Sequence, residues 1–559
     1  MRPRNPFVLV LTALFLAGCS SAKEELHESD ASSASRIGFV RLQRDGAQLL
    51  GKREPPRREM PMQVAAADFS TETGSIGADR ERYDAIAENR FTSPLDDPRS
   101  TFSIDVDTAS YSNVRRFLTH GQRPPRGAVR IEELINYFDY DYEPPSGDLP
   151  FSVTTELSQA PWNPDHQLLL VGLQAAALAD QDVPPRNLVF LIDVSGSMQA
   201  PGKLSLVKRA LRRLAGTLRR EDSVAMAVYA GAAGVVLPPT PGGDGGRILA
   251  ALERLEAGGS TNGGEGIRLA YALARRSFDP EAINRVLLAT DGDFNVGITS
   301  RSDLLELIER EREAGIFLTV LGVGTDDLND AGMEELADHG NGNYAYLDSL
   351  AEARKVLVAE AGSTLVTAAK DVKIQIEFNP RHVGAYRLIG YENRLLDARD
   401  FDDDAIDAGE IGAGHSVTAL YEVVPVGLEH GVDTGTASGL RYQRGARETF
   451  GHRDELALVR LRYKAPLGDE SELLEHGVPT AATGVADASD DLRFGAAVAL
   501  FGMLLRDSAH TGSGDWPLVE ELARGARGAD PRGLRAGFLR LAVAARTLPE
   551  EHARAGSLR

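Results

Sequence analysis

The chain has 559 residues and a formal net charge of −21, with 42% hydrophobic and 26% charged residues. This composition is that of a globular protein and argues against a disordered or fibrous chain. The negative charge argues against nucleic acid as a partner, because such a surface repels phosphate backbones. Since Cys19 is the single cysteine, an internal disulfide framework, a cysteine-based zinc site and an iron–sulfur cluster are excluded.

The N-terminal residues predict a lipoprotein signal peptide over residues 1–18. Two arginines precede an apolar run, Phe7 to Ala17, of about 11 residues, which is too short to span a bilayer. The run leads into Ala17-Gly18-Cys19, which resembles a bacterial lipobox. We therefore expect Cys19 to be lipidated and to anchor the chain in the cell envelope. Because Ser20 and not Asp follows, we expect the outer membrane, at its periplasmic or surface face.

The next two regions differ in regularity. Residues 19–90 show no sustained apolar period and predict a flexible tether. Residues 91–148 predict a short strand followed by helices. Asp105 and Asp107 in this region suggest metal ligands, but a strand followed by a helix that Asp107 or Thr108 caps explains them better.

Two regions alternate apolar and polar residues, which is typical of strands with one packed and one solvated face. They span residues 149–185 and 371–466, and Val372 to Phe378 gives the clearest alternation. Neither region has enough strands to bury a core alone, so we expect the two to pair in one β-sandwich. We expect a helical C-terminal segment, residues 486–548, to pack beside it.

Residues 186–360, between the two β regions, alternate strands and helices. This order predicts an α/β domain with a doubly wound, mostly parallel sheet, inserted between the halves of the sandwich. The apolar run 187–192 is typical of a strand buried on both faces. We expect strands at 187–192, 223–229, 234–237, 285–289 and 316–323, helices at 203–220, 263–276 and 302–314, and a mobile surface turn at 242–246.

Polar side chains gather where these strands end. Asp193, Ser195 and Ser197 follow the first strand, Thr261 precedes a helix, and Asp291 follows the fourth strand. Ligands of such sheets bind at the carboxyl ends of the strands, and hydroxyl and carboxylate oxygens suit a hard divalent cation. The five residues therefore predict a site for Mg²⁺, or for Mn²⁺ or Ca²⁺. Because few carboxylates contact the cation, it stays electrophilic toward an external acid.

The five residues, in this order, resemble the metal-ion-dependent adhesion site (MIDAS) of von Willebrand factor type A (VWFA) domains, over residues 186–360. The segments 102–117, 129–138 and 492–507 resemble the YfbK-type family of bacterial lipoproteins. The resemblance implies a VWFA fold, a magnesium-type site and a protein partner that presents an acidic residue to the cation.

Three functions are open at this point. The first is a binding module that captures a protein partner through the cation, the second a metal-dependent hydrolase, and the third a structural envelope protein with a vestigial metal site. We favour the binding module and expect no enzyme, because the motif brings no His, Lys or Glu placed as a general base. An EF-hand at Asp291 is rejected, because Val296 and Ser302 stand where that loop needs Gly and Glu. No nucleophile elbow surrounds either serine.

Overall fold

The structure is a computed structural model that describes residues 81–147, 149–179, 181–260, 262–292, 300–325, 328–360, 365–404, 406, 408–428, 454–466, 468 and 470–548. The chain divides into two units, residues 1–73 and 74–559, and all described residues belong to the second. The predicted signal peptide, Cys19, nearly all of the predicted tether and Thr261 lie outside the described residues. Among the described helices, none is both long and apolar enough to cross a membrane.

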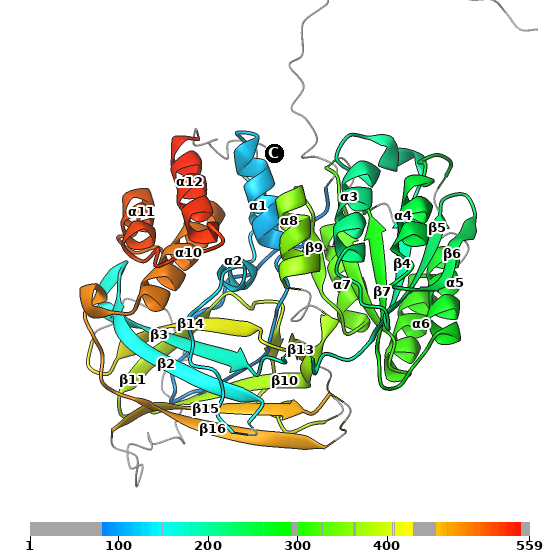
Figure 1. Ribbon diagram of the computed structural model, residues 1–559. Coiled ribbons are helices and arrows are strands. Elements are labelled where there is room, and N and C mark those ends of the chain that lie inside the picture. Colours follow the sequence, from blue (N-terminus) through cyan, green and yellow to red (C-terminus); the bar gives the residue numbers. More distant parts are fainter. Residues whose placement is uncertain are drawn as a thin grey trace, which may run out of the picture. The chain divides into compact units, whose positions relative to one another are not determined.

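The α/β domain is built on a six-stranded sheet with the order β6-β5-β4-β7-β8-β9 (Figure 1). Neighbouring strands are parallel, except that β6 pairs with β5 antiparallel. The predicted doubly wound, mostly parallel sheet is therefore confirmed. The strands are β4 (Arg186–Asp193), β5 (Ser223–Tyr229), β6 (Ala233–Pro241), β7 (Ile283–Thr290), β8 (Phe317–Gly322) and β9 (Tyr344–Tyr346).

Helices cover both faces of this sheet. In β4, Phe190 belongs to one core and Leu191 to the other, as a continuous apolar run requires. One face carries α3 (Leu204–Ala215), α4 (Gly245–Glu253), α8 (Leu350–Arg354) and a π-helical turn (Lys355–Ala359), and the other carries α5 (Gly263–Arg276), α6 (Arg301–Glu313) and α7 (Asp330–His339). A short 3₁₀ turn (Gly196–Gln199) follows β4. The predicted surface turn at 242–246 is shorter than expected, because α4 begins at Gly245 and buries Ile248.

The β regions on either side of the α/β domain lie in one two-sheet sandwich with a common core (Figure 1). One sheet has the order β11-β14-β3-β2: β11 (Val383–Ile389), β14 (Ser416–Pro425), β3 (Asn163–Ala175) and β2 (Phe151–Ala160). The other has the order β12-β1-β10-β15-β16, with β13 also paired to β10: β12 (Leu395–Leu396), β1 (Arg99–Ser103), β10 (Thr367–Phe378), β15 (Glu455–Lys464), β16 (Ser471–Pro479) and β13 (Gly409–Gly412). Leu157 of β2 and Ile374 of β10 share the core between the sheets.

A helical layer covers the outer face of the four-stranded sheet. In β3, Leu168 and Leu170 face the helices, whereas Leu169 and Val171 face the sandwich core. The layer combines N-terminal and C-terminal helices: α1 (Ala109–Thr119), α2 (Ile131–Asn136), α10 (Asp490–Arg506), α11 (Trp516–Gly525) and α12 (Leu534–Thr547), with short 3₁₀ turns at Arg126–Ala128 and Val485–Asp487.

The predicted cap of α1 is not formed. Thr108 precedes the helix without a side-chain capping hydrogen bond. The Oδ1 atom of Asp107 instead accepts a hydrogen bond of 2.8 Å from the backbone N–H of Tyr344 in β9. Asp107 therefore ties the N-terminal region to the α/β domain rather than to its own helix.

Candidate metal centre

Asp193 is the last residue of β4, and the loop after it folds back toward its carboxylate. The backbone N–H of Ser195 donates to Oδ1 of Asp193 at 2.8 Å. The Oγ atoms of Ser195 and Ser197 lie 3.0 Å apart, so the two hydroxyls face each other. Asp193 and Ser195 are buried, whereas Ser197 is exposed. One carboxylate and two hydroxyls therefore meet at the carboxyl edge of the sheet, as predicted.

A second loop, before α5, is fastened to the first. The N–H of Gly196 donates to the carbonyl of Gly259 at 3.0 Å, and the N–H of Gly258 donates to the carbonyl of Val194 at 2.7 Å. A Cβ atom at Gly196 would lie only 3.3 Å from that Gly259 carbonyl, so the close approach favours glycine. Thr261, the predicted ligand of this loop, lies outside the described residues, and its role stays a prediction.

Asp291 follows β7, the strand that pairs in parallel with β4. Its carboxylate is buried, and Oδ2 accepts a hydrogen bond of 3.0 Å from Nζ of Lys203. The other oxygen, Oδ1, is buried without a hydrogen-bond partner among the described residues. A buried carboxylate oxygen without a partner is costly, so this atom is a ligand position that an ion would satisfy.

The electrostatics of Asp193 favour a cation beside it. Burial raises its pKa, and the negative charge of Asp291 raises it further, whereas hydrogen bonds from Ser195 and Tyr229 oppose the rise. Thr290 also donates to Oδ2 of Asp193, at 3.4 Å. Two buried carboxylates, two facing hydroxyls and an oxygen without a hydrogen-bond partner among the described residues together fit the donor set of a hard divalent cation.

Two residues at this site were not predicted. Lys203 stands at the start of the predicted helix 203–220, four residues before buried Val207. A lysine on the apolar side of a predicted helix indicates a buried charge, and this was the feature of the sequence that could have identified Lys203. Tyr229 ends β5 and is fully buried, and burial is the main reason that its pKa is raised well above the usual range. In the sequence, Tyr229 is indistinguishable from an ordinary core residue of a strand, so the pattern did not predict its place at the site.

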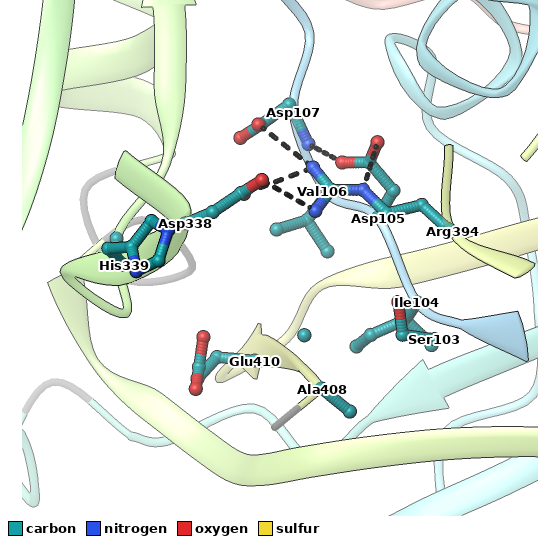
Figure 2. A pocket seen from close by; sticks show the side chains of 12 residues that line it. Ser103, Ile104, Asp105, Val106, Asp107, Asp338, His339, Arg394, Ala408 and Glu410 are labelled. Carbon is teal, nitrogen blue, oxygen red and sulfur yellow. Dashed lines mark hydrogen bonds and ion pairs between the residues drawn. The ribbon is translucent and has the colours of Figure 1, made fainter. Parts of the chain in front are cut away.

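Asp105 and Asp107 do not belong to this centre. They line a separate cavity of about 190 Å³ with Asp338, Glu410 and Arg394, among others (Figure 2). Arg394 lies between the carboxylates, with its Nε atom 3.2 Å from Asp105 and its Nη1 atom 2.8 Å from Asp338. Asp105 and Asp107 therefore belong to an arginine-bridged network.

The network extends deeper into the molecule. Carboxylate oxygens of Asp105, Glu133 and Glu334 lie within 4.8 Å of one another. Arg130 binds Glu133, and its Nη1 atom lies 2.5 Å from Asp330 and 3.5 Å from Glu334. Burial is the largest cause that raises the pKa of Glu334, to about 7. The arginines partly neutralise this cluster, which joins the N-terminal region to α7 of the α/β domain.

Three family models match successive parts of the chain. They are described as von Willebrand factor, over residues 77–170, von Willebrand factor type A domain, over residues 187–358, and the C-terminal region of uncharacterized protein YfbK, over residues 363–548. The von Willebrand factor type A model spans the four described residues of the predicted metal site and Thr261.

Individual relatives extend these matches. Uncharacterized protein YfbK of Escherichia coli K12 is 44% identical over 469 residues, which cover 82% of this chain and 80% of that protein. Human inter-alpha-trypsin inhibitor heavy chain H3 is 28% identical over 216 residues, or 36% of this chain and 24% of that protein. A solved von Willebrand factor type A structure from Catenulispora acidiphila is 18% identical, covers 70% of this chain and 89% of its own, and has a TM-score of 0.40.

Proposed function

Because the chain belongs to the YfbK family and contains a von Willebrand factor type A domain, we propose that it captures a protein partner through a divalent cation. Asp193, Ser195, Ser197 and Asp291, with Thr261, would hold the cation, and an acidic side chain of the partner would complete its coordination. The single observation that carries this proposal is the buried Oδ1 of Asp291, which has no hydrogen-bond partner in the part of the chain that the structure describes and lies beside a second buried carboxylate.

The donor set favours Mg²⁺. Mg²⁺ is a hard cation that takes oxygen ligands and keeps part of its coordination open to water or to an incoming oxygen. The bound cation would supply a positive centre that attracts a carboxylate, despite the net charge of −21 of the chain. The protein's own groups orient the ligands: Ser195 and Thr290 hold Asp193, and Lys203 holds Asp291.

The two groups at the site that could transfer a proton, Lys203 and Tyr229, favour a binding role over hydrolysis. Lys203 is engaged in an ion pair with Asp291, so its amine is not free to act as a base. Tyr229 has a pKa well above its usual range, mainly because of burial, so its hydroxyl stays protonated at neutral pH. The structural alternative, a vestigial site, predicts no cation binding and is separated by the experiment below.

The test is capture of a partner from the native envelope. The full chain is crosslinked in envelope preparations with Mg²⁺ or with EDTA, and captured proteins are identified by mass spectrometry. We expect at least one protein that is captured with Mg²⁺, lost with EDTA and lost with Asp193→Ala. Asp244→Ala is the matched control, since this exposed acid of the same domain precedes α4 away from the site. Capture that is equal with and without EDTA contradicts the proposal.

We propose further that Cys19 carries the lipid that holds the chain in the envelope, in the outer membrane. The support is the lipobox-like sequence that ends at Cys19. Cys19→Ser should leave the protein unacylated and move it from the detergent phase to the aqueous phase in a detergent partition assay. A variant that partitions like the wild type would show that Cys19 is not the anchor.

A further inference from the structure

The chain itself places a cationic group at the predicted metal site. Lys203 immediately precedes α3, its side chain is 6% exposed, and its Nζ atom lies 3.0 Å from Oδ2 of Asp291. A buried ammonium group is costly unless an opposite charge compensates it. The ion pair therefore compensates both Lys203 and Asp291 when no metal is bound.

Backbone contacts around Gly324 fix the position of this ammonium group. The aliphatic stem of Lys203 lies against Gly324, which follows β8. The φ of Gly324 is +86°, a value that favours glycine. A Cβ atom at Gly324 would overlap Cε of the lysine and would approach Cδ at 2.9 Å. The carbonyl of Gly324 is fixed in turn by the hydroxyl of Tyr346, at 2.6 Å. The close contact with Gly324 therefore fits the unbranched stem of Lys203, whose amino group lies against Asp291.

The lysine and a divalent cation would use different oxygens of one carboxylate. Nζ of Lys203 donates to Oδ2 of Asp291, whereas Oδ1 has no hydrogen-bond partner among the residues described by the structure. Two cations that share a carboxylate repel each other strongly at such short range in a partly buried site. Asp193, Asp291 and Lys203 together carry a charge of −1, which a divalent cation changes to +1.

We propose that Lys203 is a tethered counter-ion that competes with the divalent cation for the charge of Asp291. It stabilises the metal-free site, lowers the affinity of the site for the cation, and leaves the loaded site positively charged toward an acidic ligand. Lys203 is thus a positioning residue. This inference rests on the proposed function, because it concerns the cation at the same residues.

The test is titration with Mn²⁺ alone, followed by electron paramagnetic resonance of the free ion, on the full mature chain. Lys203→Met keeps an unbranched side chain and removes the charge. The dissociation constant of this variant for Mn²⁺ should therefore be at least tenfold lower than that of the wild type. Lys203→Arg keeps the charge and should stay within about threefold of the wild type. Lys208→Met is the matched control on α3, because Lys208 binds backbone carbonyls away from the site, and it should not change the affinity.

Stability gives a second readout. In EDTA, Lys203→Met should melt at a lower temperature than the wild type, because Asp291 is left buried without its counter-ion. Mn²⁺ should raise the melting temperature of Lys203→Met by more than it raises that of the wild type. If the Met variant does not fold, Lys203→Gln is titrated by the same criterion. If the neutral variant, Lys203→Met or Lys203→Gln, binds Mn²⁺ no more tightly than the wild type does, the inference is overturned.

The outcomes also separate this inference from the proposed function. If the wild type binds no Mn²⁺ but Lys203→Met does, the counter-ion is supported and metal-dependent capture by the natural chain is contradicted. If neither binds Mn²⁺, both are overturned. Asp193→Ala, introduced into each background, should abolish the binding, and persistence of binding would show that the ion lies elsewhere and would also overturn the inference.

Discussion

Two regions of the molecule bury carboxylates, and they differ in what compensates the negative charge. In the network at the base of α7, Asp105, Glu133 and Glu334 each lie beside a guanidinium of Arg130 or Arg394. At the carboxyl edge of the α/β sheet, Asp291 is compensated by the single amino group of Lys203, 3.0 Å from one of its oxygens. Among the described residues, each region holds a buried carboxylate oxygen without a hydrogen-bond partner, Oδ2 of Asp107 in the network and Oδ1 of Asp291 here, but Oδ2 of Asp107 lies 3.7 Å from Nη2 of Arg394. The first region has more acidic residues, yet the second fits a metal better. How far the protein's own cations compensate the carboxylates, rather than the number of acids, therefore distinguishes the candidate cation site from the network.

The largest expected effect concerns an arginine of the network. Arg130→Met leaves Glu133, Asp330 and Glu334 without their shared partner, so we expect a loss of about 3–5 kcal/mol in the free energy of unfolding, measured in urea. Arg399→Met is the control. Arg399 is exposed and pairs with exposed Asp397, so its loss should cost less than about 1 kcal/mol. Equal losses in the two variants would show that Arg130 does not compensate the buried carboxylates of the network.

An intermediate effect should appear in the pH dependence of stability. The pKa values of Glu132 and Glu334 are raised to about 7, chiefly by burial, above the value of an unfolded glutamate. The folded state therefore keeps protons that the unfolded state has released between about pH 4.5 and pH 7. The stability that these groups contribute is complete below pH 4.5 and is lost as the pH rises through 7.

The measurement is urea unfolding between pH 5 and pH 7.5. One such group changes the free energy of unfolding by up to about 1.4 kcal/mol per pH unit, so over this range we expect a loss of about 2 kcal/mol from each of the two groups. Glu334→Gln should reduce the slope by about half, because the amide does not titrate and Glu132 still does. A Gln variant with the slope of the wild type would show that Glu334 does not hold the proton.

The smallest effect on stability is expected at the candidate metal centre. Burial and Asp291 raise the pKa of Asp193, so its ionised form is disfavoured in the fold. Asp193→Asn keeps an acceptor for the N–H of Ser195, and in EDTA we expect a change of less than about 1 kcal/mol, toward higher stability. The same variant should lose the rise in melting temperature that Mg²⁺ gives the wild type, as read by differential scanning calorimetry. A large destabilisation in EDTA would mean that Asp193 serves the fold.

The pattern of the sequence predicts the α/β sheet well, because its information is local. A run such as 187–192 is buried on both faces, and polar residues that follow such strands must meet at one edge. Asp193, Ser195 and Ser197 could be placed together for this reason. The hydroxyl contact between the serines depends only on residues that are two positions apart.

The missed features depend on contacts between distant segments. Asp107 accepts its hydrogen bond from Tyr344, 237 residues away, and no local pattern can distinguish this bond from a helix cap. Helix α7 was missed because its polar face is buried rather than solvated, with Asp330 paired to Arg130. Lys203 was taken as an ordinary helical residue because Asp291, its partner, lies 88 positions further along the chain.

The junction at α7 determines how the α/β domain can be used outside this chain. Asp330 contacts Arg130 and Asn113 of the N-terminal region, and Arg115 of the same region binds Asp348. Residues 186–360 expressed alone would expose these groups without their partners. Residues 74–559 form one compact unit. In this chain the α/β domain is thus part of a larger folding unit, and residues 186–360 alone would be a poor reagent for finding partners.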